Sequence, residues 1–296
     1  MLRVKFSFVR TASMKPDIRI GGHVSTRGGF LAAAQHAAGI GSSAYQYFPK
    51  NPRSLHLKTP DMRNAAACSK FCQEQGLVSI AHTPYPSNMA VGLTRGEEFY
   101  QLTVDSLKND LLIAEGCGSL GIVVHFGHLK SSDMLEGYQN IIRCLNDVLS
   151  DWTGRAKLLI ENQAGDHGPM GMTLEESVKV RQLADYPDKI GFCLDTCHLF
   201  AAGGWDISNT AELLARGQEL GYWEPTVAVH LNDSKYGAGS RKDRHARIGQ
   251  GMIGTDALKR LALAPELVGK AFILESEKGA DGTHREDIAM VQSWSV

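Results

Sequence analysis

The chain alternates short apolar runs with longer amphipathic stretches, and this alternation limits its fold more than any other feature. Eight apolar runs are predicted to be β-strands: Arg19–His23, Ala44–Phe48, Val78–Ala81, Gly121–Val124, Leu158–Ile160, Gly191–Leu194, Val227–Val229 and Ala271–Leu274. The helices predicted between them include Phe30–Ala38, Met62–Glu74, Phe99–Glu115, Leu135–Leu149, Leu174–Leu183, Ala211–Glu219 and Thr255–Leu263. Strands that alternate with helices form βαβ units, in which neighbouring strands run parallel.

The number of strand–helix units favours a closed barrel over an open, doubly wound sheet. A length of 296 residues fits one large barrel or two ordinary domains, and no linker-like stretch divides the chain. We therefore predict the α/β class and a single (β/α)8 TIM barrel over residues 18–296. Its active site is expected at the carboxyl-terminal ends of the strands.

Residues 1–17 differ from the remainder, since they carry four basic residues and no acid before Asp17. Their apolar part is too short and broken for a secretory signal. We predict a tail outside the fold, either disordered or the product of a start upstream of Met14. A cytoplasmic, prokaryote-like protein is expected, although a short basic segment is also compatible with organelle targeting.

The formal net charge of −1 argues mildly against a nucleic-acid partner, because proteins that grip DNA phosphates are often basic. The basic residues are nevertheless clustered. One cluster consists of Lys235, Arg241, Lys242, Arg244 and Arg247, and a second of Lys50, Arg53 and Lys58. Such clusters give a neutral protein a local surface that could face phosphates.

The cysteine count of six does not indicate a disulfide framework in a chain of this length. Four are interpreted as buried thiols of a protein in a reducing compartment: Cys68, Cys72, Cys117 and Cys144. Cys193 and Cys197 flank Asp195 with the spacing C-x-x-x-C. Packing is favoured for Cys193, and Cys197 is kept as a candidate neighbour of a metal site.

The most informative residues follow the predicted strands. Six consecutive strands are followed by a histidine or an acid: His82, His125, Glu161, Asp195, His230 and Glu275. Three more candidates are His198, next to Asp195 in sequence, and Asp243 and His245 in the long loop after the seventh strand. One such residue would usually cap a helix or belong to a loop. Because the carboxyl ends of barrel strands form one ring, we expect all nine to meet there.

Imidazole and carboxylate groups are the ligands of zinc, manganese and iron. Nine of them exceed the need of one ion and suit two or three ions that share carboxylates.

Two other sequence motifs do not have the structural surroundings that their usual functions require. Gly116–Gly121 matches G-x-G-x-x-G but precedes a strand, so it is interpreted as a helix end and turn. Asn232–Ser234 matches a glycosylation acceptor, but it falls within the expected site and is discounted.

Several segments together resemble the endonuclease IV family of apurinic/apyrimidinic endonucleases: HVSTRGGF, NPRS, LDTCHLFAAGGWD, VHLNDSK, DRH and ILES. The resemblance runs from about Arg19 to near the carboxyl terminus, and the LDTCH, HLND and DRH segments are its most specific part. It implies a (β/α)8 barrel with three Zn²⁺ ions, one position of which Mn²⁺ or Fe²⁺ could take.

The resemblance also implies which residues hold each ion. His82, His125 and Glu161 would hold the first ion, and Glu161 would bridge to the second. The other ligands of the second ion would be Asp195, His230 and Glu275. The third ion would be held by His198, Asp243 and His245.

The implied substrate is duplex DNA with abasic sites or blocked 3′ ends. The family cuts the strand 5′ to an abasic site, leaving a 3′-hydroxyl, and Glu161 is our candidate for orienting or deprotonating the nucleophile. His23, Asn51, Arg53 and Tyr85 align with segments that face DNA. Lys235, Arg241 and Arg244 are further candidates from the local charge. We expect a monomer.

Three places depart from the family pattern. Phe126-Gly127 replaces Pro-Gly after His125, Ser276-Glu277 replaces Thr-Pro after Glu275, and PSNMAVG replaces an Asn-Leu-Gly loop after Tyr85. None of these removes a candidate ligand. They affect the shape of the lesion pocket, and Glu277 adds an acid near a phosphate path.

Three alternative functions use the same residues. A sugar isomerase or epimerase would need Glu161, Asp195, His230 and Glu275 on one or two ions, leaving the other candidates without a role. A lesion-binding protein would use zinc only to stabilise its fold. A phosphatase or other phosphoesterase would share the metal chemistry but would not explain the Asn51, Arg53 and Tyr85 loops. A metal count separates the sugar enzyme from the nuclease.

Overall fold

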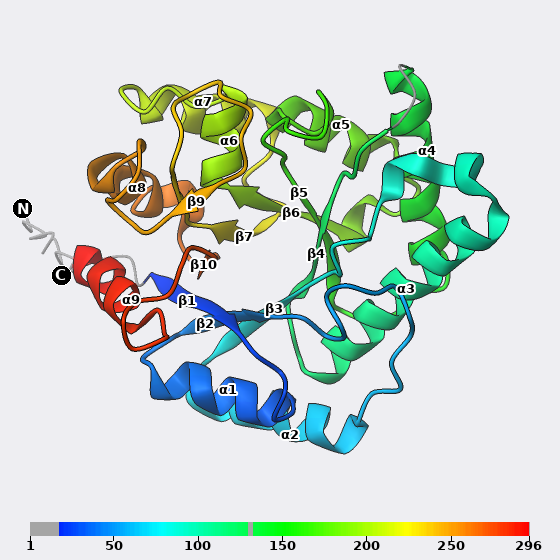
Figure 1. The fold of residues 1–296 in the computed structure, drawn as a ribbon, viewed down its shortest axis with the longest axis horizontal. Coiled ribbons are helices and arrows are strands. Elements are labelled where there is room, and N and C mark those ends of the chain that lie inside the picture. The colour runs from blue at the N-terminus through cyan, green and yellow to red at the C-terminus, as the bar shows by residue number, and fades with distance from the viewer. Residues whose placement is uncertain (1–17, 130–132, 296) are drawn as a thin grey trace, which may run out of the picture.

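The computed structural model describes residues 18–129 and 133–295, and within them eight parallel strands close into a barrel in the order β1-β10-β7-β6-β5-β4-β3-β2. The barrel strands are β1 (Arg19–Val24), β2 (Ala44–Tyr47), β3 (Val78–His82), β4 (Gly121–His125), β5 (Lys157–Glu161), β6 (Ile190–Asp195), β7 (Thr226–His230) and β10 (Ala271–Leu274). Figure 1 shows them at the centre of the molecule with the helices around them. The predicted (β/α)8 barrel is confirmed, and the predicted tail, residues 1–17, lies outside the described residues.

The helices around the barrel are α1 (Phe30–Gly39), α2 (Met62–Gln75), α3 (Glu97–Gly116), α4 (Met134–Leu149), α5 (Leu174–Leu183), α6 (Thr196–Ala202), α7 (Thr210–Leu220), α8 (Thr255–Ala262) and α9 (Arg285–Gln292). In the part of the chain that the structure describes, none of them has the length and apolar character needed to cross a bilayer. The predicted end of a helix at Gly116 is confirmed, and Gly118 after it has a φ of 70°.

Two short helices and one hairpin were not predicted. Helix α6 starts directly after β6, and the Asp195 side chain caps it by accepting a hydrogen bond from the His198 amide at 2.7 Å. Because Thr196–Ala201 are all buried, this helix lacks the polar face that identifies an amphipathic helix in a sequence. Helix α9 has eight residues. The two-residue strands β8 (Asp233–Ser234) and β9 (His245–Ala246) pair antiparallel above the barrel.

The apolar core has two parts. A larger cluster fills the space between the strands and the helices. A smaller one fills the barrel itself with inward-facing side chains: Ala44, Ile80, Val123, Leu159, Cys193, Ala228, Ala271 and Ile273. Small residues let the strands approach, and at Gly21 of β1 a Cβ atom would lie 1.6 Å from the carbonyl oxygen of Ala44. The barrel is therefore a packed support and not a pore.

Candidate metal centre

The nine candidate ligands lie at one end of the barrel, and six of them form a layer directly above its apolar interior. Side chains alternate between the two faces of a strand, so residues two apart point the same way. The apolar residues Ile80, Val123, Leu159, Cys193, Ala228 and Ile273 are each followed two positions later by a candidate. Those candidates are His82, His125, Glu161, Asp195, His230 and Glu275. The strand pleat therefore turns all six toward the barrel axis.

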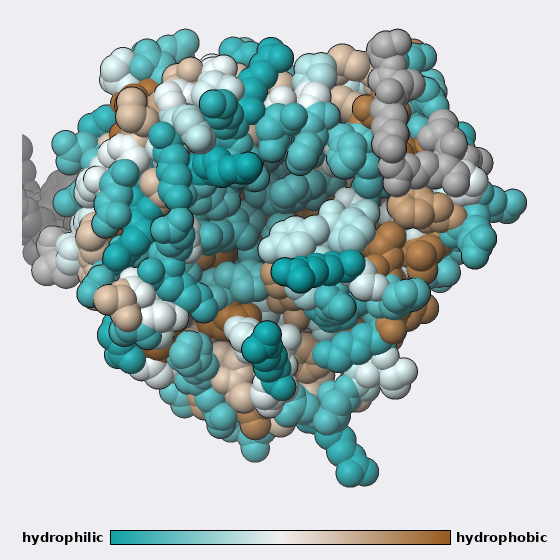
Figure 2. Space-filling view, in the orientation of Figure 1, coloured by the Kyte–Doolittle hydropathy of each residue, from teal (hydrophilic) through white to brown (hydrophobic). Residues whose placement is uncertain are grey.

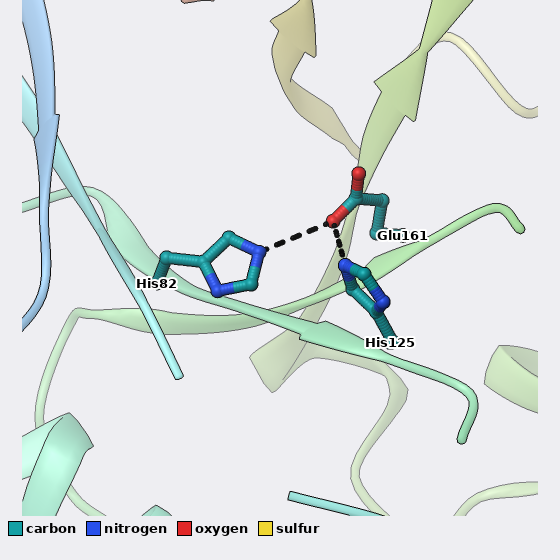
Figure 3. A group of neighbouring side chains, drawn as sticks. All are labelled: His82, His125 and Glu161. Carbon is teal, nitrogen blue, oxygen red and sulfur yellow. Dashed lines mark ion pairs between the residues drawn. The ribbon is translucent and has the colours of Figure 1, made fainter. Parts of the chain in front are cut away.

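The first group joins β3, β4 and β5 (Figure 3). The Nε2 atoms of His82 and His125 lie 3.5 and 3.0 Å from the same oxygen, Oε2 of Glu161. Together the three offer ligand atoms within 4.8 Å of one another. This spacing suits one ion bound between two imidazoles and a carboxylate.

The second group shares Glu161 and lies deeper. Nδ1 of His230 is 2.9 Å from Glu161 Oε1, 3.0 Å from Glu275 Oε2 and 3.8 Å from Asp195 Oδ2. Asp195 and His230 are fully buried. Since the two oxygens of Glu161 face different groups, this carboxylate could bridge two ions.

The third group lies between α6 and the loop that ends in β9. Oδ1 of Asp243 is 3.2 Å from Nε2 of both His198 and His245. His245 Nε2 also lies 3.6 Å from Asp195 Oδ2, so the third group adjoins the second. Cys197 is close enough to Asp243 and His245 to be a ligand. However, burial raises the pKa of its thiol to about 12, and its Sγ–H donates to the carbonyl of Arg244.

Hydrogen bonds orient three of the imidazoles so that an unprotonated nitrogen can face the centre. Nδ1–H of His82 donates to the carbonyl of Thr83 at 2.8 Å, and Nδ1–H of His198 donates to the carbonyl of Asn162 at 2.9 Å. Nε2–H of His230 donates to Oε1 of Gln46 at 2.8 Å. Metal-binding histidines commonly hold the second ring nitrogen in this way.

Three amide side chains near the centre were missed by the sequence analysis. Gln46 donates from Nε2 to Glu275 Oε1 at 2.6 Å. Asn232 donates to Asp195 Oδ2 at 2.8 Å and accepts from the Glu275 amide at 2.9 Å. Asn162 accepts from the amide of Asp195 at 2.8 Å. Two signals could have identified them: Gln46 follows the inward-facing Ala44 by two positions, and the asparagines lie one residue after Glu161 and two residues after His230.

The ionisable groups influence one another strongly. Burial opposes ionisation of Glu161, yet His230 and His125 hold its pKa well below the usual range. Burial likewise opposes protonation of His198 and His230, but neighbouring acidic groups raise the pKa of both well above the usual value. The pKa of Glu275 is lowered to about 2, against the effect of burial, chiefly by His230. The cluster therefore favours anionic carboxylates next to cationic partners.

Three buried atoms of the cluster make no hydrogen bond: Oε2 of Glu161, Nε2 of His198 and Nε2 of His245. A buried polar atom without a partner typically destabilises a protein by about 1–3 kcal/mol. Each of these atoms faces other ligand-type atoms. The residues present therefore fit divalent cations, which would satisfy all three atoms.

The predicted DNA-facing residues surround this centre. Tyr85 is 70% exposed, and its ring lies 5.3 Å from that of Phe48, which also packs against His23 at 4.5 Å. Burial lowers the pKa of His23 to about 4. Asn51 and Arg53 occupy the exposed loop after β2, and the carbonyl of Pro52 in that loop accepts a hydrogen bond from the Tyr85 amide.

The residues of the predicted basic cluster Lys50, Arg53 and Lys58 do lie together, but only Arg53 is exposed. Lys50 is buried, and its Nζ lies 3.0 Å from Oδ1 of Asp110 while donating to the Ser106 carbonyl. Lys58 donates from Nζ to the carbonyl of Pro49 and lies over the Phe30 ring. Both ammonium groups therefore stabilise the loop, which leaves Arg53 as the cluster's surface cation.

The other predicted basic cluster is partly neutralised. Lys235 forms an ion pair with Glu277 at 2.8 Å, and Arg247 binds Glu286 and Asp287. Arg244 donates to the carbonyl of Asp243. Arg241 has a φ of 53°, and its amide donates to the carbonyl of Ala201 at the end of α6. This last contact fixes the loop that carries Asp243 and His245.

Two grooves open next to the centre. The larger, about 850 Å³, borders Glu275 and is called here the Glu275 groove; its lining includes His23, Arg27, Arg53, Ser276, Lys278 and His284. The smaller, about 420 Å³, is called the His125 groove; its lining includes Tyr85, His125, His128, His167, His198 and Asp243. Figure 2 shows a hollow in the middle of this face, lined mainly by hydrophilic residues.

Comparison with known proteins gives consistent matches. Residues 34–294 match the family model described as "Xylose isomerase-like TIM barrel". A relative from Symbiobacterium thermophilum named "Probable endonuclease 4" is 37% identical over 276 residues, which are 93% of this chain and 99% of the relative. A protein of the same name from Halothermothrix orenii is 35% identical over 88% of this chain and 94% of its own length. The crystal structure of endonuclease IV from Thermus thermophilus superposes with a TM-score of 0.81 and 32% identity, covering 93% of this chain and 98% of that one.

Proposed function

The chain belongs to the endonuclease IV family of xylose isomerase-like TIM barrels, and on that premise we propose that it is a DNA-repair nuclease that hydrolyses the strand 5′ to abasic sites. The observation that carries the proposal is the cluster of nine candidate ligands, with its three unpartnered buried atoms. Such a cluster needs cations, and a phosphodiester is a substrate that clustered cations bind well.

The proposed cofactor is a set of three Zn²⁺ ions, with Mn²⁺ or Fe²⁺ as alternatives at one position. His82, His125 and Glu161 would hold one ion, and Asp195, His230 and Glu275 a second that Glu161 also binds. His198, Asp243 and His245 would hold the third. Four carboxylates contribute about −4 and three zinc ions about +6, so the site is net cationic. A near-neutral chain would thus attract a DNA phosphate.

Bound zinc supplies one kind of chemistry, since it lowers the pKa of water toward about 7 and offsets charge on the reacting phosphate. Glu161 lies between the first two groups, so its carboxylate is placed to orient the attacking water or to accept its proton. Phosphorus would then be attacked in line from the side opposite the departing 3′ oxygen, and the P–O3′ bond would break as the new P–O bond forms. The departing oxygen would lie next to His198, Asp243 and His245 and would take a proton from water to become the 3′-hydroxyl.

Recognition of the lesion is assigned to the loops around the centre. Tyr85 offers an exposed aromatic ring, and Asn51 and Arg53 lie on the adjoining loop that the Tyr85 amide contacts. These side chains would enter the duplex at the lesion. An abasic site has no base to unstack, so extruding it costs less than extruding an intact nucleotide. The same centre would remove blocking groups from 3′ ends where a phosphodiester joins the group to the strand.

The test is incision of a labelled duplex with one tetrahydrofuran abasic analogue, which cannot undergo β-elimination. Zinc-loaded protein, chelator-stripped protein and a Glu161→Gln variant are compared. Glu74→Gln, the same change at an exposed residue of α2, is the matched control. We expect cutting 5′ to the analogue by the loaded protein and the control, and a large loss in the other two samples.

No cutting by protein that demonstrably holds zinc would contradict the proposal. Two further assays would then separate the alternatives. Tight binding of the abasic duplex without cleavage would indicate a lesion-binding protein. Turnover of ketoses with one ion per chain would indicate a sugar isomerase or epimerase.

A further inference from the structure

The Glu275 groove carries an excess of positive charge that the metal centre does not explain. Its lining contains two histidines and Glu275, its one acid, which belongs to the centre; the basic residues of the lining are Arg27, Lys50, Arg53, Lys58 and Lys278. Arg27 comes from the loop after β1 and Lys278 from the segment after β10. Neither is among the residues that the family resemblance assigns to DNA.

The cations of this groove differ in whether they already have a partner. Lys50 and Lys58 are held by Asp110 and by the carbonyl of Pro49. By contrast, the exposed side chains of Arg27 and Lys278 form no ion pair with any residue in the described ranges 18–129 and 133–295. Cations that line one groove without ion-pair partners create a positive potential that attracts an anion from solvent.

The inner end of the groove is also polar and incompletely satisfied. Ser276 is 7% exposed and His284 is 3% exposed, and both line the groove. Oγ of Ser276 and Nδ1 of His284 have no hydrogen-bond partner. Buried groups of this kind usually bind an ordered water or a ligand. These two groups therefore indicate a polar ligand, which would bind them directly or through a water molecule.

The position of the groove indicates which part of the DNA would occupy it. The His125 groove contains His198 and Asp243, which we assigned to the departing 3′ oxygen. That oxygen belongs to the nucleotide on the 5′ side of the cleaved bond, so the 5′ part of the strand would lie there. The abasic nucleotide and the strand 3′ to it would leave on the other side of the centre, past Glu275.

We propose that the Glu275 groove binds backbone phosphates on the 3′ side of the lesion, with Arg27 and Lys278 as the phosphate-binding side chains. This inference rests on the proposed nuclease function. It adds a second anion site, separate from the metal centre, that holds the strand in a fixed direction. Ser276 and His284 form the polar floor of that site.

The experiment measures incision kinetics for the zinc-loaded double variant Arg27→Ala/Lys278→Ala on the tetrahydrofuran duplex. Lys70→Ala/Lys179→Ala is the matched control, because both lysines are exposed on outer helices away from the groove. We expect KM to rise about tenfold with kcat unchanged, and the slope of log affinity against log salt to shrink by about 2, or about 0.9 per lost phosphate contact. The control should behave as the wild type.

Duplexes with two neutral methylphosphonate linkages on one side of the lesion then identify the side; on the 5′ side they are placed at the second and third positions, so that the scissile linkage stays a phosphodiester. With neutral linkages on the 3′ side, the double variant should show no increase in KM beyond that of the wild type on the same duplex. With neutral linkages on the 5′ side, the increase in KM caused by the linkages and the increase caused by the double variant should multiply. A wild-type KM in the double variant, or coupling only to the 5′ linkages, would overturn the proposal. Failure of the proposed nuclease function would be visible separately, because the zinc-loaded wild-type protein would not cut the duplex.

Discussion

Two adjacent layers of side chains inside the barrel, built on the same strands, have opposite chemistry. The lower layer contains Ile80, Val123 and Leu159 and is fully buried and apolar. The upper layer begins two residues later on each strand, with His82, His125 and Glu161. One step of the strand pleat therefore separates residues that stabilise the barrel from residues that we assign to chemistry. Changes in the two layers should affect different measurements.

The largest expected effect is in the upper layer. Glu161→Gln keeps the size of the side chain but removes the charge and the proton acceptor. We expect kcat for incision to fall by about 10²–10⁴, the range for loss of a general base. The zinc content and the unfolding midpoint of the zinc-loaded variant, measured in parallel, should show that it binds its ions and folds. A drop of less than tenfold would assign the proton transfer to another group.

The counterpart in the lower layer is Leu159→Ala, two residues earlier on β5. Leu159 is fully buried inside the barrel, so the change leaves a cavity and should lower the free energy of unfolding by about 2–5 kcal/mol. Chemical denaturation checks this value. The fraction of Leu159→Ala protein that remains folded should have the kcat of the wild type. A loss of kcat as large as that of Glu161→Gln would remove the functional distinction between the layers.

A third change tests whether the upper layer depends on its amide neighbours. Gln46→Leu removes the acceptor of the His230 proton and the donor to Glu275. Loss of such a supporting contact usually lowers metal affinity by about 10–100-fold. Competition with a chelator should measure this loss for one ion only. The control Gln101→Leu, at an exposed position on α3, should leave the affinity unchanged.

The pH dependence gives a smaller effect whose sign follows from the histidines. The raised pKa values of His198 and His230 mean that their protonated forms stabilise the metal-free protein at low pH. This stabilising contribution is complete below about pH 6.5, the usual pKa of histidine. It is lost as the pH rises through the raised pKa values of the two histidines. Metal binding requires the unprotonated rings. The difference in unfolding midpoint between loaded and metal-free protein should therefore widen as the pH rises, and a narrowing difference would contradict the proposed ligands.

The smallest effect concerns the surface pair of Lys235 and Glu277. Glu277→Gln releases Lys235 from an exposed ion pair, which is worth about 0–1 kcal/mol. If Lys235 contacts DNA, the variant should bind an abasic duplex up to about fivefold more tightly at low salt. Anisotropy titrations at two salt concentrations check this. Unchanged binding at both would remove Lys235 from the DNA-facing set.

The sequence predicted the parts of the molecule that depend on periodic patterns. Strand ends could be located because apolar runs stop abruptly at His82, His125 and Glu161. Gln46 was missed because a single glutamine inside a predicted strand carries no chemical signal until its partners, His230 on β7 and Glu275 directly after β10, are known. Lys50 was misassigned for a related reason. Its partner, Asp110, lies 60 residues later on α3, and burial of a lysine is not encoded in its neighbours along the chain.

The most direct test of the central claim is anomalous diffraction at the zinc edge from crystals of the zinc-loaded protein. The account predicts three peaks. One should lie among His82, His125 and Glu161, and one should be shared by Glu161, Asp195, His230 and Glu275. The third should be bound by His198, Asp243 and His245. A single peak in the four-residue group, with His198 and His245 unligated, would contradict the account and favour a one-metal sugar enzyme.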